Sequence, residues 1–159
     1  MRALVQRVNE AEVEVAETVV GRIGRGLLVY LGVACGDVPA GATRLAEKVA
    51  HIRLFKDEAD KLNLSVQDVG GGILAVPNFS LMAETGKGRR PAFVAAAGRR
   101  EAEPLYQRFC SALAEYPCAV ACGVFGARMI VRSAADGPVN VIVEMPAGGA
   151  EQEVRPTSD

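Results

Sequence analysis

The stretch "GLLVYLGVAC", residues 26–35, decides the fold of this chain. It is a continuous apolar run that begins at a glycine, which is typical of a central strand with both faces buried. The segment before it, from about residue 2, predicts an extended strand, because apolar and polar residues alternate in it over 11–15. Between these two strands, "TVVGRIG" at 18–24 predicts a turn.

Two helices are predicted farther along the chain, because apolar residues recur there at helical spacing. The first helix is expected over residues 40–53 and the second over residues 101–116. The second helix has an apolar stripe wide enough to cover a sheet, made of Ala102, Leu105, Tyr106, Phe109, Cys110 and Leu113. The segment between the first helix and the next strand, residues 55–71, is polar and rich in turn residues.

Three later strands complete the prediction of an α/β fold. "GILAV" at 72–76 is short and apolar and ends at Pro77. "ARMIVRS" at 127–133 predicts a strand with Met129 and Val131 facing inward. The last strand is expected to begin at Pro138, with one face formed by Val139, Val141, Val143 and Met145. The Gly137–Pro138 step is then at the entrance of this strand, where the missing N–H of proline is harmless.

Composition limits the classes of function. The chain has 159 residues, 50% of them hydrophobic and 23% charged, which predicts one domain over 1–146 followed by a flexible tail at 147–159. A net charge of -1 provides no overall basic field, so no DNA partner is expected. No signal peptide or long apolar segment is present in the sequence, so a cytoplasmic protein without a membrane partner is expected.

Few residues in the sequence are suited to metal binding or acid–base catalysis. The single histidine, His51, lies on the flank of the first predicted helix, where a structural or solvated role is expected. The four cysteines lack the paired spacing of a zinc site and are expected to be reduced apolar fillers. We therefore expect no metal and no cofactor.

Two loops and one dipeptide have the character of a binding site. Residues 76–93 follow a strand and run through a loop that contains Lys87, Arg89 and Arg90, although an ordinary solvated loop has the same composition. "GVFGARM" at 123–129 has two glycines that suggest either close backbone approach or a tight strand entry. The Gly137–Pro138 bond is of the kind that can be cis, which would turn two adjacent carbonyls the same way, as a rigid gauge for a substrate.

An ordered series of motifs gives the chain a resemblance to a known family. The motifs are "ALVQRV" (3–8), "GLLVYLGV" (26–33), "RLFKD" (53–57), "LNLSV" (62–66), "NFSL" (78–81), "GRRPAF" (88–93), "LYQRF" (105–109) and "DGPV" (136–139). In order and spacing they resemble the D-aminoacyl-tRNA deacylases, formerly called D-tyrosyl-tRNA deacylases, over roughly residues 1–146. The resemblance implies a mixed, largely antiparallel, barrel-like sheet with two main helices.

The resemblance also implies a substrate and a way of selecting it. The enzyme would hydrolyse the ester of D-aminoacyl-tRNA and glycyl-tRNA as a homodimer, for proofreading in translation. In the family the Gly-Pro bond is cis, and this loop enters the active site of the partner subunit, where its carbonyls leave no room for an L side chain. Gly137 and Pro138 would form that loop here, with Arg7 and Asn140 supporting it.

The chemistry that the resemblance implies needs no ionisable side chain. Backbone N–H groups near Phe79 and Ser80 would stabilise the oxyanion, and the ribose 2′-hydroxyl of the tRNA would assist the attacking water. Pro77, Asn78 and Met129 would contact the substrate, together with Gly137 and Pro138.

Departures from the family pattern leave alternatives open. The usual Ser-Gln-x-Thr-Leu motif is Pro77-Asn78-Phe79-Ser80-Leu81 here, and the usual threonine after Gly-Pro-Val is Asn140. A proline before the amide residue also occurs in the animal branch of the family, which removes L-alanine from mischarged tRNA. A variant deacylase with relaxed chirality and a catalytically silent dimer that binds tRNA ends are the two alternatives.

Overall fold

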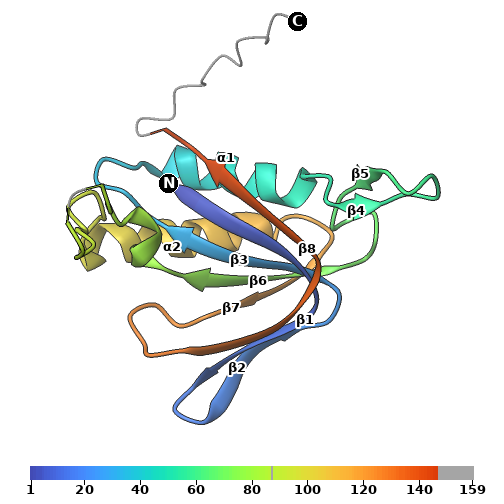
Figure 1. Cartoon of the computed structure of the whole chain (residues 1–159), viewed down its shortest axis with the longest axis horizontal. Coiled ribbons are helices and arrows are strands. Elements are labelled where there is room, and N and C mark those ends of the chain that lie inside the picture. The colour runs from blue at the N-terminus through green and yellow to red at the C-terminus, as the bar shows by residue number, and fades with distance from the viewer. Residues whose placement is uncertain (87, 147–159) are drawn as a thin grey trace, which may run out of the picture.

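The computed structural model describes residues 1–86 and 88–146, which form a curled mixed sheet with two helices packed on one side (Figure 1). The predicted tail at 147–159 lies outside the described residues. The elements are β1 (Arg2–Val15), β2 (Thr18–Ile23), β3 (Gly26–Gly32), α1 (Pro39–His51), β4 (Phe55–Lys56), β5 (Leu62–Leu64), β6 (Gly72–Pro77), the 3-10 helix η1 (Phe79–Met82), α2 (Arg99–Leu113), β7 (Ala119–Cys122) and β8 (Ile130–Glu144).

The main sheet is mixed, as predicted. Its strand order is β2-β1-β3-β6-β7, and β8 pairs with β1. β1 is antiparallel to β2, β3 and β8, whereas β6 lies parallel to both β3 and β7. The curl of the sheet in Figure 1 gives the barrel-like shape that the family resemblance implied.

The part of the apolar run that forms β3, residues 26–32, is buried on both faces except at the half-buried Tyr30, because β3 separates two cores, whereas Cys35 at the end of the run is exposed. Leu27 and Val29 belong to the larger core, which lies between the helices and the sheet. Leu28 belongs to the smaller core, inside the curl of the sheet. β6 alternates in the same way, with Ile73 in the larger core and Leu74 in the smaller one. This explains why both strands are apolar at nearly every position.

The turn predicted within 18–24 is wrong for all but its last residue. Residues 18–23 form β2, and only Gly24 lies in the bend that leads into β3. The turn between β1 and β2 lies earlier, at Ala16 and Glu17, which have φ angles of 47° and 64°. The sequence offers no glycine or asparagine at these two positions, so the usual signal for a positive φ is missing.

The two strands predicted at 127–133 and from Pro138 are one strand. β8 pairs with β1 from Ile130 opposite Glu14 to Glu144 opposite Arg2, and it runs through the Gly137–Pro138 step. Irregularities in the pairing on β1 between Gln6 and Glu10 accommodate that step without ending the strand. The dipeptide is therefore inside a bulged strand, not at a strand entrance as predicted.

The backbones of β3 and β6 approach closely at the start of their pairing, and this predicts an effect on stability. A Cβ atom at Gly26 would lie 1.9 Å from the carbonyl oxygen of Gly72, so the two backbones would have to separate. We expect Gly26→Ala to lower the free energy of unfolding by about 3 kcal/mol or more. Denaturant titration followed by circular dichroism measures it. Gly24→Ala is the matched control, because its Cβ would meet nothing within 4 Å; equal midpoints for both variants would contradict the close approach.

Candidate active site

The segment that follows β6 is held in a tight local arrangement. Asn78 caps η1, and its Oδ1 accepts hydrogen bonds from the Ser80 N–H at 3.1 Å and from the Ser80 hydroxyl. The Asn78 N–H donates to the carbonyl oxygen of Leu31 at 2.8 Å, which ties the turn to the end of β3. An asparagine at this position suits the fold, because its short side chain reaches the backbone two residues later.

A cavity of about 380 Å³ opens beside this segment. Pro77, Asn78, Phe79 and Met129, four of the residues expected at the site, line it. Ser80 does not line it, and neither do Arg7, Gly137, Pro138 and Asn140. Phe125, Gly126 and Ala127, which belong to the stretch 123–129 singled out in the sequence, also line it. The remaining wall residues were not predicted: Leu31, Val33, Ala96, Ala97, Arg99 and Ala102.

The two backbone donors expected to stabilise an oxyanion differ in their surroundings. The Ser80 N–H is already occupied by the Asn78 side chain. The Phe79 N–H makes no hydrogen bond within the described ranges 1–86 and 88–146. The Phe79 ring is 62% exposed and contacts the ring of Phe93 edge-on, with 5.0 Å between centroids. Of the two expected donors, only the N–H of Phe79 is without a hydrogen-bond partner among the described residues.

Tyr106 of α2 fixes the ends of β6 and β7 beneath the cavity. Its hydroxyl lies 3.0 Å from the carbonyl oxygen of Ala75 and 2.9 Å from that of Gly123. Burial raises the pKa of this phenol well above its ordinary value, so it stays protonated and donates. A Cβ at Gly123 would lie 2.8 Å from the sulfur of Met129, which shows how closely β7 and the segment before β8 approach. The sequence predicted Tyr106 only as part of an apolar stripe.

The Gly137–Pro138 bond is cis, and the loop around it is held by Arg7. Arg7 is 6% exposed and donates from Nη1 to the carbonyl oxygen of Leu54 at 2.6 Å. Its Nε lies 2.9 Å from Oδ2 of Asp136, at an angle that makes an ion pair without a hydrogen bond. Asn140, the other residue expected to support the loop, is exposed and lies opposite Gln6 in the β1–β8 pair.

Within one chain the loop and the cavity are far apart. Gly137 lies near Arg7, which pairs with Leu27 close to the beginning of β3, whereas Pro77 pairs with Leu31 near the end of β3. Leu27 and Leu31 are four residues apart along β3, which corresponds to about 13 Å. In addition, β1 and β3 lie between β8, which carries the loop, and β6, which leads to the cavity. The loop lines a separate cavity of about 460 Å³ together with Arg25 and Lys56.

The residues considered for acid–base or metal chemistry lie elsewhere. The His51 ring is at the end of α1, where Nδ1 is 2.8 Å from the carbonyl oxygen of Glu47 and the ring contacts Tyr116. All four cysteines are free thiols, but they are not the buried apolar fillers that the sequence predicted, since Cys35 is exposed and the other three are half-buried. The described residues contain no group of side chains suited to a metal ion. Of the basic cluster predicted in the loop after β6, Arg89 and Arg90 are exposed, while Lys87 lies outside the described residues.

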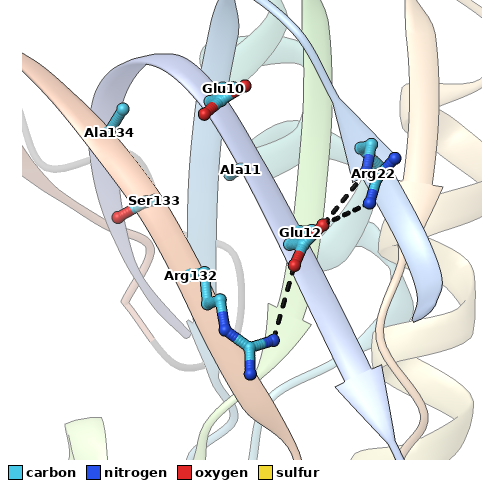
Figure 2. Close-up of a pocket in the computed structure, with 7 residues that line it drawn as sticks. All are labelled: Glu10, Ala11, Glu12, Arg22, Arg132, Ser133 and Ala134. Carbon is cyan, nitrogen blue, oxygen red and sulfur yellow. Dashed lines mark hydrogen bonds and ion pairs between the residues drawn. The ribbon is translucent and has the colours of Figure 1, made fainter. Parts of the chain in front are cut away.

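A further cavity, of about 480 Å³, lies on the outer face of β1, β2 and β8 and has a different character. In Figure 2, Glu12 of β1 lies between Arg22 of β2, at 2.6 Å, and Arg132 of β8, at 3.4 Å. The hydrogen bond from Arg22 holds the pKa of Glu12 below its ordinary value. Arg132 also pairs with Glu14 at 2.7 Å. These charges neutralise one another across three strands, so the cavity has the features of a structural charge ladder.

Among the described residues, no helix is long and apolar enough to cross a bilayer.

Comparison with known proteins identifies the chain. A family model described as D-Tyr-tRNA(Tyr) deacylase matches residues 4–144. A protein of Chloroflexus aurantiacus described as D-aminoacyl-tRNA deacylase is 51% identical over 144 residues, which cover 91% of this chain and 90% of the relative. A protein of Geobacter metallireducens with the same description is 51% identical over 146 residues, covering 92% of this chain and 97% of the relative.

Two solved structures are similar in fold. One, described as c-Myc DNA Unwinding Element Binding Protein, is 37% identical with a TM-score of 0.86 and covers 92% of this chain and 100% of its own. The other, described as a probable eukaryotic D-amino acid tRNA deacylase, has a TM-score of 0.77, covering 89% of this chain and 97% of its own. At 21% identity the second supports the fold alone.

The curled mixed sheet and the matches define the class first: the chain is an enzyme of the hydrolase class, a deacylase. It belongs to the D-Tyr-tRNA(Tyr) deacylase family. The predicted family, fold class and assignment as an enzyme are thereby confirmed.

Proposed function

We propose that this enzyme hydrolyses the ester bond of D-aminoacyl-tRNA and of glycyl-tRNA in the cytoplasm, releasing free amino acid and tRNA. The observation that carries the proposal is the identity of about half the residues with curated D-aminoacyl-tRNA deacylases over nine-tenths of the chain. The cavity supports it, since a mostly apolar space with one free backbone donor at its edge suits a reactive ester more than a stable amide.

The proposed hydrolysis depends on backbone, because the cavity offers no acidic side chain and no histidine among its lining residues. Water adds to the ester carbonyl carbon and loses a proton, and negative charge develops on the carbonyl oxygen. The intermediate then breaks its C–O bond to the ribose oxygen, which takes up a proton and leaves as a hydroxyl of the tRNA. The N–H of Phe79 stabilises that oxygen, and the neighbouring 2′-hydroxyl of the terminal adenosine assists the attacking water. Asn78 holds η1 in place and so positions the donor.

Selection between D and L substrates is proposed to use a second copy of the chain. The loop at Gly137–Pro138 enters the cavity of the partner subunit and leaves no room for an L side chain. The separation of loop and cavity within one chain supports an arrangement in trans. So do large exposed apolar side chains, which a second subunit would cover: Phe79, Val94 and Ile142 are 62%, 82% and 62% exposed.

The substrate range is the first test of the proposal. We expect the purified enzyme to release D-tyrosine and glycine from their tRNAs and to leave L-tyrosyl-tRNA intact, measured with labelled amino acids. Equal rates for D- and L-tyrosine would remove the chiral part. Release of L-alanine from a non-cognate tRNA in preference to D-tyrosine would favour the variant deacylase, and tight binding without release would favour a silent tRNA-binding dimer.

The origin of the loop is tested by mixing variants. Gly137 has a φ of 117°, and an added Cβ would lie 2.9 Å from a methyl of Val139 and 3.1 Å from Arg7 Nη2, so Gly137→Ala displaces the loop. We expect this variant to release L-tyrosine as well as D-tyrosine. Gly24→Ala serves as its control.

The mixed sample distinguishes a loop in trans from one in cis. After subunit exchange with excess Phe79→Pro protein, which has a defective cavity and an intact loop, the L-tyrosine release of Gly137→Ala should fall while D-tyrosine release persists. Only a loop supplied by the other subunit restores the rejection. Unchanged L-tyrosine release, in a sample shown to exchange subunits, would contradict the proposal.

The backbone donor is tested by a matched pair at one position. Phe79 follows the N-cap of η1, where proline is tolerated, so Phe79→Pro removes the N–H and the ring while Phe79→Ala removes the ring alone. We expect kcat of Phe79→Pro to fall by roughly 100-fold to 1000-fold relative to Phe79→Ala. Ser80→Ala should retain most activity. A folded Ser80→Ala protein with no activity would instead indicate a serine nucleophile.

A further inference from the structure

Arg99 has a position that the proposed chemistry does not explain. It is the first residue of α2, and it lines the same cavity as Pro77, Asn78 and Phe79. Every other described residue that lines this cavity is uncharged. A single cation at the wall of an otherwise neutral cavity has no partner in an uncharged ester carbonyl, so its ligand would be another part of the substrate.

The guanidinium of Arg99 lies close to Gly126, another residue that lines the cavity. A Cβ at Gly126 would be 3.3 Å from Nη1 and 3.5 Å from Cζ, so the absence of a side chain at Gly126 leaves the space for this contact. Gly126 has a φ of 76°, which also favours glycine. The side chain therefore spans from α2 to the loop that precedes β8, across the edge of the cavity.

The internal partner of Arg99 leaves part of its guanidinium unused. Nε donates to the carboxylate of Glu103, one turn later on α2, at 3.0 Å. Both side chains are partly exposed, at 69% and 32%, and an exposed pair of this spacing adds little stability. The Nη1 and Nη2 groups have no hydrogen bond to a described residue, so they remain as donors for a ligand.

A substrate with an ester on a terminal nucleotide carries its nearest negative charge one ribose away from the ester. That charge is the phosphodiester that links the terminal nucleoside to the rest of the chain. Phe79 and Arg99 line the same cavity of about 380 Å³, so a nucleotide whose ester lies at the N–H of Phe79 would have its phosphate on the Arg99 side of that cavity in the arrangement proposed below. Arginine suits this ligand, because its parallel N–H donors match the oxygens of a phosphate.

We propose that Arg99 binds the phosphate on the 5′ side of the terminal nucleotide of the substrate, and so sets the depth at which the ester sits in the cavity. The inference rests on the proposed function for the identity of the substrate. It adds a phosphate-binding residue to a site whose other described walls are neutral. It also predicts that the enzyme distinguishes an aminoacyl nucleotide from an aminoacyl nucleoside.

The test uses minimal ligands that differ only in the phosphate. D-tyrosine is joined through a non-hydrolysable amide to the 3′ position of adenosine, and the same compound is made with a 5′-phosphate. Calorimetry measures the Kd of both for the full chain. We expect the phosphorylated ligand to bind about tenfold more tightly to the wild-type enzyme, as for one partly exposed charge-assisted contact.

The variants separate the effect of the Arg99 side chain from the effect of the protein's net charge. Arg99→Ala should remove the preference for the phosphorylated ligand and leave the Kd of the unphosphorylated one within about twofold, because the proposal gives Arg99 no contact with the unphosphorylated ligand and its pair with Glu103 is exposed. Arg99→Lys should keep part of the preference. Arg100→Ala is the matched control: it makes the same change in net charge at the next residue, which is exposed and does not line the cavity.

Each outcome decides the inference. Loss of the preference in Arg99→Ala, with retention in Arg100→Ala, supports it. It is overturned by a wild-type enzyme that binds both ligands equally, or by an Arg100→Ala effect as large as that of Arg99→Ala. The matching hydrolysable esters separate this question from the function itself, since failure to cleave them would reject the proposed deacylation while the two Kd values still decide the role of Arg99.

Discussion

The parallel pairing of β3 with β6 is the constraint on which the rest of the structure depends. Gly26 and Gly72 let the two backbones meet at the start of the pair, and the register then continues to its end, where Leu31 lies beside Pro77. The N–H of Asn78 donates to Leu31, so the turn into η1 begins at a fixed point of the sheet. Because both strands are buried on both faces, a shift in register would expose apolar side chains in two cores. The location of the cavity is therefore a consequence of strand pairing.

The elements that can be predicted from the sequence are those in which the positions of the apolar residues show which faces are buried. α2 and β3 are of this kind, since their apolar residues report directly which faces are covered. β7 was not predicted, because Ala119–Cys122 is short and becomes a strand only where β6 offers a parallel edge. The two predicted strands form the single strand β8 for the same reason, because β1 is long enough to pair with the residues on both sides of Gly137–Pro138. Tertiary pairing, which local propensity does not contain, decides these cases.

The candidate site is still less visible in the sequence, because it is assembled from separate segments. The residues themselves mark the segment 76–93 and the Gly137–Pro138 step, but the role of Phe79 and the entry of the loop into a partner subunit come only from the resemblance to a family. The walls at Ala97, Arg99 and Phe125 come from parts of the chain that meet only in the fold. That the loop lies at the other end of the sheet from the cavity follows from the register of three strand pairs, and no pattern along the chain records it.

The family usually has a glutamine where this chain has Asn78, and this difference affects both the local fold and the proposed chemistry. An asparagine amide is one methylene shorter than the glutamine usual in the family, and here its oxygen turns back to accept from both the N–H and the hydroxyl of Ser80. A side chain used in this way stabilises η1 and occupies one of the two backbone donors near the ester. Under the proposed mechanism, the remaining donor, at Phe79, would stabilise the oxyanion alone. The position of the substrate along the cavity becomes correspondingly important, since a single hydrogen bond to the developing charge is sensitive to displacement of the ester.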